Sequence, residues 1–332
     1  PLSAVFFMLF SKGVRACIIC SSEVVIMKKP YAVVIGGINM DICARSIAPL
    51  IPRDSNPGIV KTSLGGVGRN IAHNMRLLGL DVHLMTVFGD DMNARHIQDS
   101  CRSLGIDTSC SVTVPGARTS TYVFITDPDG EMQLAVSDMG IYEHLTPGHF
   151  REHMELLCNA AAVVIDTNMP EESIRWLTDN VTAPIFADPV STTKGMKLKS
   201  SLGKISTLKP NLIEAELLSG VKITDNGSLR EAARALLGTG LGRVFISMGS
   251  RGVFAADKDS SAHLDTMCFN MVNTTGCGDA FMAALVWAAV RGLGLEESAR
   301  CGVAASSIAM ESEETINPAM CEEELIRRTG DR

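Results

Sequence analysis

Short apolar segments alternate with amphipathic segments along most of the chain. Residues 31–35 form an apolar run that ends in two glycines, which predicts a buried strand. Similar runs predict strands at 82–88, 162–165, 185–187, 205–208 and 243–247. Apolar residues at helical spacing predict helices at 71–80, 94–104, 171–180, 194–202, 212–218, 229–237 and 281–290. This alternation indicates a parallel sheet that helices cover on both faces.

One region interrupts the alternation. Residues 110–114 and 119–126 show the two-residue period of a strand, and residues 131–136 provide a matching strand. The sequence Asp-Pro-Asp-Gly at 127–130 predicts a hairpin turn between the second and third of these segments. We therefore expect an antiparallel piece that stands apart from the helical units.

Composition and charge narrow the function classes. The chain has 332 residues, is 46% hydrophobic and carries a net charge of −7. It has no long basic run of the kind that binds a phosphate backbone, so we expect no nucleic-acid partner. Ten scattered cysteines fit free thiols in a reducing, cytoplasmic setting. Cys17 and Cys20 form a lone C-x-x-C without the second pair of ligands typical of a zinc site.

The first residues differ from the rest of the chain. An apolar run at 2–10 is too short to span a bilayer, and the charges of Lys12 and Arg15 follow it instead of preceding it as in a signal peptide. We expect residues 1–27 to be a disordered extension of doubtful origin and residues 28–330 to be the folded domain. A tail that associates with a membrane is the alternative.

The segment 273–280 (Asn-Thr-Thr-Gly-Cys-Gly-Asp-Ala) carries the clearest chemistry. It runs into the predicted buried helix at 281–290, and a helix N-terminus binds anions through its exposed N–H groups and its dipole. Asp279 beside such an anion site could accept a proton from a hydroxyl group that attacks a phosphoryl group. Gly-x-Gly-Asp is also common in ordinary turns, so this segment alone leaves both interpretations open.

A second Gly-rich segment, 65–70 (Gly-Gly-Val-Gly-Arg-Asn), precedes a predicted helix. Its glycines would let the backbone approach a ligand, and Asn70 would act either as a ligand contact or as a helix cap. Because ligands of parallel sheets bind beyond the carboxyl ends of the strands, the polar residues and glycines that follow the strands should cluster there. These residues are Asn39, Asp41, Asp166, Asn168, Asp188, Lys209, Asn211, Glu214, Gly249 and Gly252.

Together, the two Gly-rich segments resemble the paired signatures of the PfkB (ribokinase-like) carbohydrate kinases. Residues 65–72 follow the pattern Gly-Gly-x-Gly-x-Asn-x-Ala, and residues 274–281 follow Thr-x-Gly-x-Gly-Asp-x-Phe. The resemblance implies a three-layer α/β/α sandwich with a mostly parallel central sheet and a small β-sheet lid from parts of 39–64 and 110–138. Within the family, residues 39–41, 54–58, 188–191 and 207–211 are similar to those of bacterial pseudouridine kinases.

The resemblance implies phosphorylation of the 5′-hydroxyl of a ribosyl substrate by ATP with Mg²⁺. Pseudouridine is the expected substrate, a kinase for ribose, inosine or fructose is the alternative, and a non-catalytic sugar sensor is a third interpretation. Asp279 would be the base, and the backbone of Gly276, Cys277 and Gly278 would form the anion hole. The sugar would contact Asn39, Asp41, Gly65, Gly66, Asn70 and Asn168.

The remaining positions concern the nucleotide, cations and partners. Asn211 and Glu214 match the N-x-x-E element that organises Mg²⁺ through water, although Glu214 is also suited to cap a helix. The ATP phosphates and ribose would be lined by Ser247, Gly249 and Gly252. Asn273 replaces an Asp that often helps to hold K⁺ in relatives, so K⁺ dependence is open, and Cys277 replaces the usual Ala. The resemblance also implies a homodimer formed through paired lids.

Overall fold

The computed structural model describes residues 19–20, 23–24, 29–267 and 270–330. Within them, a central sheet of nine strands runs parallel from β15 to β8 and ends in two antiparallel strands at the other edge. In spatial order the strands are β17 (Ser261–Leu264), β16 (Val253–Asp257), β15 (Arg243–Ser247), β14 (Thr207–Leu208), β13 (Ile185–Asp188), β12 (Ala162–Asp166), β3 (Tyr31–Ile35), β6 (Asp81–Met85) and β8 (Ile106–Asp107).

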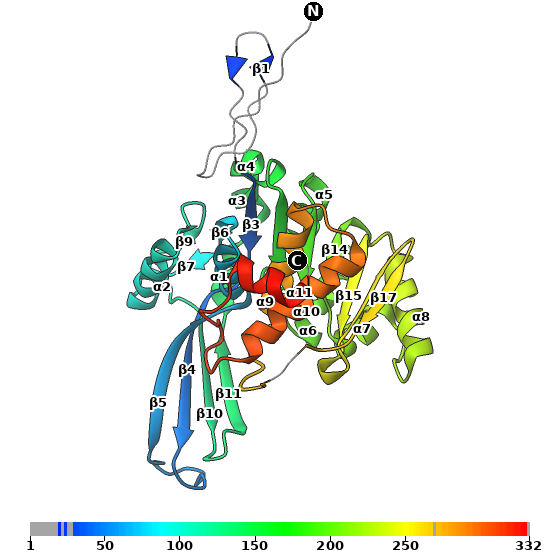
Figure 1. Ribbon diagram of the computed structural model, residues 1–332. Helices are drawn as coiled ribbons and strands as arrows, with labels where there is room; N and C mark the ends of the chain where they lie inside the picture. The colour runs from blue at the N-terminus through cyan, green and yellow to red at the C-terminus, as the bar shows by residue number, and fades with distance from the viewer. Residues whose placement is uncertain (1–18, 21–22, 25–28, 268–269, 331–332) are drawn as a thin grey trace, which may run out of the picture.

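Helices cover both faces of this sheet (Figure 1). Alternate residues of β3 enter two separate cores: Ala32 and Val34 pack with one, and Val33 and Ile35 with the other. The first core includes α1 (Val67–Leu77), α2 (Met92–Ser103), α9 (Cys277–Val290), α10 (Leu295–Met310) and α11 (Glu322–Thr329). The second includes α3 (Pro147–Glu152), α4 (Met154–Cys158), α5 (Glu171–Asn180), α7 (Leu212–Ser219) and α8 (Asn226–Leu237). The predicted three-layer sandwich is confirmed.

A second sheet projects from the body of the molecule (Figure 1). We call it the small sheet, and its order is β11 (Met132–Asp138), β10 (Thr121–Thr126), β4 (Asn39–Ser46) and β5 (Gly58–Gly65). β4 pairs parallel with β10, and the other two pairs are antiparallel. The predicted hairpin is therefore present, joined to strands from the region 39–65.

Several predicted boundaries were wrong. The strand expected at 82–88 is divided at Thr86 into β6 and β7 (Val87–Phe88), and β7 pairs with β9 (Val112–Thr113) in a separate two-stranded sheet. The helix expected at 194–202 is only the single turn α6 (Thr192–Gly195), followed by short 3₁₀ turns. Glycine at 195 and serine at 200 and 201 have low helix propensity, which weakens a continuous helix there. The helices α3, α4, α10 and α11 and the strands β16 and β17 were not predicted.

The predicted extension, residues 1–27, lies outside the described residues except for β1 (Ile19–Cys20) and β2 (Glu23–Val24), which pair with each other. Cys17 of the C-x-x-C motif is also outside them. None of the helices in the described part of the chain is both long and apolar enough to cross a membrane.

Candidate active site

Segments that lie far apart in the sequence meet beyond the carboxyl ends of the central strands. Nδ2 of Asn70 in α1 donates a hydrogen bond to Oδ2 of Asp279 in α9, at 2.9 Å. The N–H group of Gly37, after β3, donates to Oδ2 of Asp166 at the end of β12, at 2.6 Å. The two Gly-rich segments therefore lie side by side at the edge where α/β sheets bind ligands.

The turn before α9 requires glycine. Gly276 has a φ of 83°, and a Cβ atom there would lie 2.3 Å from the carbonyl oxygen of Thr315. The first N–H groups of α9 have no acceptor within the helix, so the N-terminus favours an anion next to Asp279. The N–H group of Cys277 donates to the carbonyl oxygen of Thr274 at 3.4 Å, a long bond that a ligand could replace.

Asp279 has the electrostatic properties of a base that works near neutral pH. Burial and the negative charge of Asp188 raise its pKa to about 7. The hydrogen bond from Asn70 and the ammonium group of Lys209 act in the opposite direction. A carboxylate with a pKa near the working pH is ionised often enough to accept a proton and basic enough to hold it.

Lys209 and Asp188 form a buried ion pair beside the anion site, with 3.1 Å between Nζ and Oδ2. Burial alone would lower the pKa of Lys209, but the carboxylates of Asp188, Asp279 and Glu214 raise it. Nζ would lie 3.2 Å from a Cβ atom at Gly278, so the ammonium group borders the first turn of α9. The sequence analysis placed Lys209 after a strand but assigned it no role. A lysine at the carboxyl end of a central strand was the feature that could have indicated its place in the site.

Asp41 lies within β4 of the small sheet, and not directly after β3 as the sequence predicted. Asn39 donates a hydrogen bond from Nδ2 to Oδ1 of Asp41. A Cβ atom at Gly65, on the neighbouring strand, would lie 2.0 Å from Oδ2 of Asp41, so only glycine leaves room for the carboxylate. Gly66 has a φ of 98°, and a Cβ atom there would lie 2.4 Å from Cα of Ile38. Asn39 and Gly65 thus adjoin the Asp41 carboxylate, and Gly66 packs against the backbone just before β4.

The charge of the buried Arg69 guanidinium acts on Asp41. Burial raises the pKa of Asp41 to about 6, while the hydrogen bond from Asn39 and the charge of Arg69 act against this rise. The Arg69 guanidinium is fixed by bonds to the carbonyl oxygen of Leu64 and Oγ of Ser100, both at 3.1 Å. Asp41 is therefore ionised at neutral pH and can accept hydrogen bonds from two neighbouring hydroxyl groups.

Asn168 belongs to a further polar group next to Gly37. Nζ of Lys194 donates to Oδ1 of Asn168 at 2.7 Å, and the N–H group of Asn168 donates to Oδ1 of Asp166 at 2.9 Å. A Cβ atom at Gly37 would lie 2.6 Å from Nδ2 of Asn168. Burial lowers the pKa of Lys194. Lys194 is therefore half-buried and held toward Asn168.

Asn211 and Glu214 form a capping box at the start of α7. The N–H group of Asn211 donates to Oε2 of Glu214, and the N–H group of Glu214 donates to Oδ1 of Asn211, both at 2.9 Å. Burial raises the pKa of Glu214. Asn211 forms a β-bridge with Ser247, and Gly249 and Gly252 follow in the β15–β16 connection with φ of 60° and 80°. These residues share one sheet edge.

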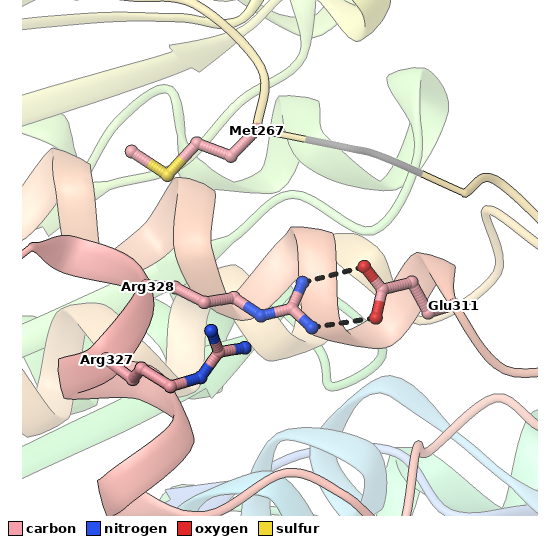
Figure 2. A pocket seen from close by; sticks show the side chains of 4 residues that line it. All are labelled: Met267, Glu311, Arg327 and Arg328. Carbon is pink, nitrogen blue, oxygen red and sulfur yellow. Dashed lines mark hydrogen bonds and ion pairs between the residues drawn. The ribbon is translucent and has the colours of Figure 1, made fainter.

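Asn273 uses both ends of its amide within the protein. Nδ2 donates to the carbonyl oxygen of Glu313 at 3.1 Å, and Oδ1 accepts from the N–H group of Thr275 at 2.9 Å. The same loop is fixed by a two-bond ion pair between Glu311 and Arg328, at 2.9 and 2.7 Å (Figure 2). A cavity of about 490 Å³ borders this pair at the end of α10 and is lined by Met267, Glu311, Arg327 and Arg328. The amide thus connects the segment before α9 to the loop after α10.

The donor set bears on metal binding. Among the described residues, no three His, Cys, Asp or Glu side chains are grouped closely enough to hold a metal ion by themselves. Magnesium keeps several of its waters and needs only one or two protein carboxylates together with substrate phosphates. Glu214 and Asp188 are suited to that role because both lie beside Lys209 at the same sheet edge.

The sequence matches the family of pfkB carbohydrate kinases over residues 29–321. A pseudouridine kinase of Escherichia coli strain K12 is 38% identical over 88% of this chain and 94% of its own length. An uncharacterized sugar kinase of the same strain is 37% identical over 89% of this chain and 82% of its own length. A ribokinase of Arabidopsis thaliana, solved with ribose and ATP, is 21% identical and aligns over 92% of this chain and 100% of its own with a TM-score of 0.83, which shows a common fold.

Proposed function

The chain belongs to the pfkB family of carbohydrate kinases, and from this premise we propose that it phosphorylates the 5′-hydroxyl of pseudouridine with ATP. A kinase of sugars or nucleosides is what the family match and the relatives establish. The acceptor hydroxyl and the base are our inference. The observation that carries it is the Asp279 carboxylate, with a pKa of about 7, at the N-terminus of α9.

In the proposed reaction, Asp279 removes the proton of the 5′-hydroxyl as its oxygen attacks the γ-phosphorus. Oδ2 of Asp279 is held by Asn70, which leaves Oδ1 for the substrate. The γ-phosphoryl group passes to the hydroxyl oxygen, and ADP leaves. Catalysis of this kind depends on positioning and on fixed charges more than on covalent chemistry.

The N-terminus of α9 and Lys209 would stabilise the negative charge of the transferring group. The backbone N–H groups of Gly276, Cys277 and Gly278 would donate hydrogen bonds to this group, and the Lys209 ammonium borders Gly278. Such groups are already oriented before reaction, so they need no reorganisation when charge develops. Magnesium bound near Glu214 would neutralise phosphate oxygens of ATP. Ser247, Gly249 and Gly252 would line the nucleotide.

Asp41 would hold the sugar. Its two oxygens can each accept an O–H group, which suits the neighbouring 2′- and 3′-hydroxyls of a ribosyl group. Asn39 fixes one of these oxygens, and Gly65 leaves space at the other. The 38% identity to a pseudouridine kinase supports the choice of base, and the Lys194–Asn168 pair offers N–H donors to carbonyl oxygens of a uracil ring.

A screen of acceptors tests the proposal. ADP formation is measured with pseudouridine, uridine, inosine, ribose and fructose, each with and without enzyme. We expect pseudouridine to give the highest kcat/KM. The 37% identity to an uncharacterized sugar kinase makes a related sugar or nucleoside kinase the competing candidate, and a clearly higher kcat/KM for ribose or inosine would establish it.

Asp279→Asn separates an enzyme from a sensor. The amide retains the shape of the side chain but cannot accept the proton, so we expect turnover to fall by about 10³-fold or more. Substrate binding, measured by calorimetry, should change little because Asp41 and Asn168 supply the sugar contacts. A sensor without catalysis would bind pseudouridine equally in both proteins and release no ADP in either.

We also propose that the small sheet is a lid over the sugar and that two lids pair in a homodimer. The register places Ile42, Val60, Val123, Leu134 and Val136 on the face opposite to Asp41. Of these, Val60, Leu134 and Val136 are 66%, 60% and 62% exposed, so the outer face is apolar and uncovered. A second copy of the chain carries the same apolar face, so the two faces would cover each other.

Leu134→Glu tests the dimer. Burying a leucine contributes about 1.5–3 kcal/mol, and a buried unpaired carboxylate costs more, so we expect the mass measured by light scattering to fall to that of a monomer. Glu131→Gln, at an exposed position before β11, is the control. A wild-type protein that is monomeric at micromolar concentration would contradict the proposal.

A further inference from the structure

We propose that Tyr122 and Phe124 form an aromatic platform on which the base of a nucleoside substrate stacks. The inference rests on the proposed function, because it assumes that a ribosyl group is held at Asp41. It adds what the protein recognises beyond the sugar, namely the flat face of an aromatic base.

The register of the small sheet places both rings on the face that carries Asp41. Tyr122 in β10 is the direct partner of Asp41 in β4, and Phe124 is the direct partner of Cys43. Paired residues project from the same face of a sheet, at neighbouring positions about 5 Å apart. A ring at position 122 therefore borders whatever molecule the Asp41 carboxylate holds.

The two rings form a partly open surface. Their centroids are 5.5 Å apart with an angle of 31° between the ring planes. Both side chains are only half-buried, and the opposite face of the same strands carries aliphatic residues instead. The Tyr122 hydroxyl lies 3.5 Å from Sδ of Met132, so the ring is turned along the sheet and not into the central core. An aromatic base would cover this surface by offset stacking.

Polar groups stand at the root of the same sheet. Met139 directly follows Asp138, which pairs with Thr121 next to Tyr122. Nζ of Lys194 lies 3.4 Å from Sδ of Met139 and 2.7 Å from Oδ1 of Asn168. A base on the platform would thus have apolar rings at its face and an ammonium group toward its edge. Flat apolar contact combined with a few polar contacts at the edge is typical of nucleobase sites.

Stacking has a restricted consequence for specificity. Every base has a π-face, so an aromatic ring stabilises many bases similarly. The platform should therefore favour nucleosides over free ribose without distinguishing pseudouridine from uridine. Discrimination between these two must come from contacts at the edge of the base.

The test compares substrates within one variant. We expect Tyr122→Leu to lower kcat/KM for pseudouridine and uridine alike, by on the order of tenfold, and to change the value for ribose by less than about threefold. Tyr122→Phe retains the ring and should restore the wild-type ratio of pseudouridine to ribose. Val123→Ala, on the opposite face of the same strand, should leave this ratio unchanged.

An unchanged ratio of pseudouridine to ribose in Tyr122→Leu would overturn the inference. Equal losses for both substrates would give this result and would indicate a packing role of Tyr122 in the sheet. The same ratio is measured as dissociation constants by calorimetry, which requires no turnover. A protein that binds pseudouridine but phosphorylates no ribosyl compound would therefore refute the proposed function, while the binding ratio would still decide the stacking role.

Discussion

A rise in pH from 6 to 8 should increase kcat/KM strongly, because the base must be ionised before it can accept the substrate proton. With a pKa of about 7, Asp279 is ionised in about one molecule in eleven at pH 6 and in about ten in eleven at pH 8, a tenfold difference. Asp41, with a pKa of about 6, is half-protonated at pH 6 and adds a factor of about two. The expected increase is about twentyfold.

Two substitutions should move this acidic limb in opposite directions. Lys209→Met removes a positive charge that lowers the pKa of Asp279, so the limb should move to higher pH. Asp188→Asn removes a negative charge that raises it and frees the Lys209 ammonium, so the limb should move to lower pH. Each direction follows from the sign of the charge that is removed, whatever the loss in absolute rate.

Initial rates at low pseudouridine concentration, with saturating ATP and excess Mg²⁺, give kcat/KM at each pH. ADP is quantified by chromatography, so that no coupling enzyme contributes its own pH dependence. A flat profile between pH 6 and 8 would refute the raised pKa of Asp279. Limbs that coincide in the wild type and both variants would show that the titrating group is not the carboxylate beside Lys209 and Asp188.

Three further predictions concern the surrounding residues. Asp41→Asn should raise the KM for the sugar about 10- to 100-fold with a smaller change in kcat, because charged hydrogen bonds contribute about 1.5–3 kcal/mol. An equal rise in the KM for ATP would argue against a sugar contact. Nδ2 of Asn273 already donates a hydrogen bond to the Glu313 carbonyl, so replacing K⁺ with tetramethylammonium should alter wild-type activity by less than about twofold. The variant Asn273→Asp should instead require K⁺ for activity. K⁺ dependence of the wild type would contradict this prediction. Tyr142→Phe leaves the buried N–H group of Ile38 without its acceptor, so urea unfolding should show a loss of about 1–3 kcal/mol, and unchanged stability would contradict the bond.

The order of layers could be predicted from the sequence because buried parallel strands have a simple pattern. The strand at 31–35, the helix at 171–180 and the strand at 243–247 coincide with β3, α5 and β15. Buried parallel strands are short and mostly apolar, so they can be recognised in the sequence without knowledge of tertiary contacts. The strand β16 and the helix α10 were not predicted although most of their residues are buried, and the mostly exposed strand β17 was not predicted either.

The candidate site was less accessible to prediction, since pairings over long stretches of sequence build it. Asp41 and Tyr122 become neighbours only through the parallel pairing of β4 with β10, and no local pattern specifies that register. The ion pair between Asp188 and Lys209 likewise depends on the adjacency of β13 and β14. Motifs predicted which residues follow strands, but only the register decides which of these residues meet.

The capping box at α7 shows why two interpretations of one motif need not exclude each other. The reciprocal bonds of Asn211 and Glu214 use Oδ1 of the first side chain and Oε2 of the second. The carboxylate is therefore fixed in orientation by the helix terminus, and its second oxygen is not committed to these bonds. A rigid carboxylate with one uncommitted oxygen is suited to hold a hydrated Mg²⁺, because the helix cap has already restricted its rotamers. The structural role of Glu214 thus prepares the role proposed for it in the site.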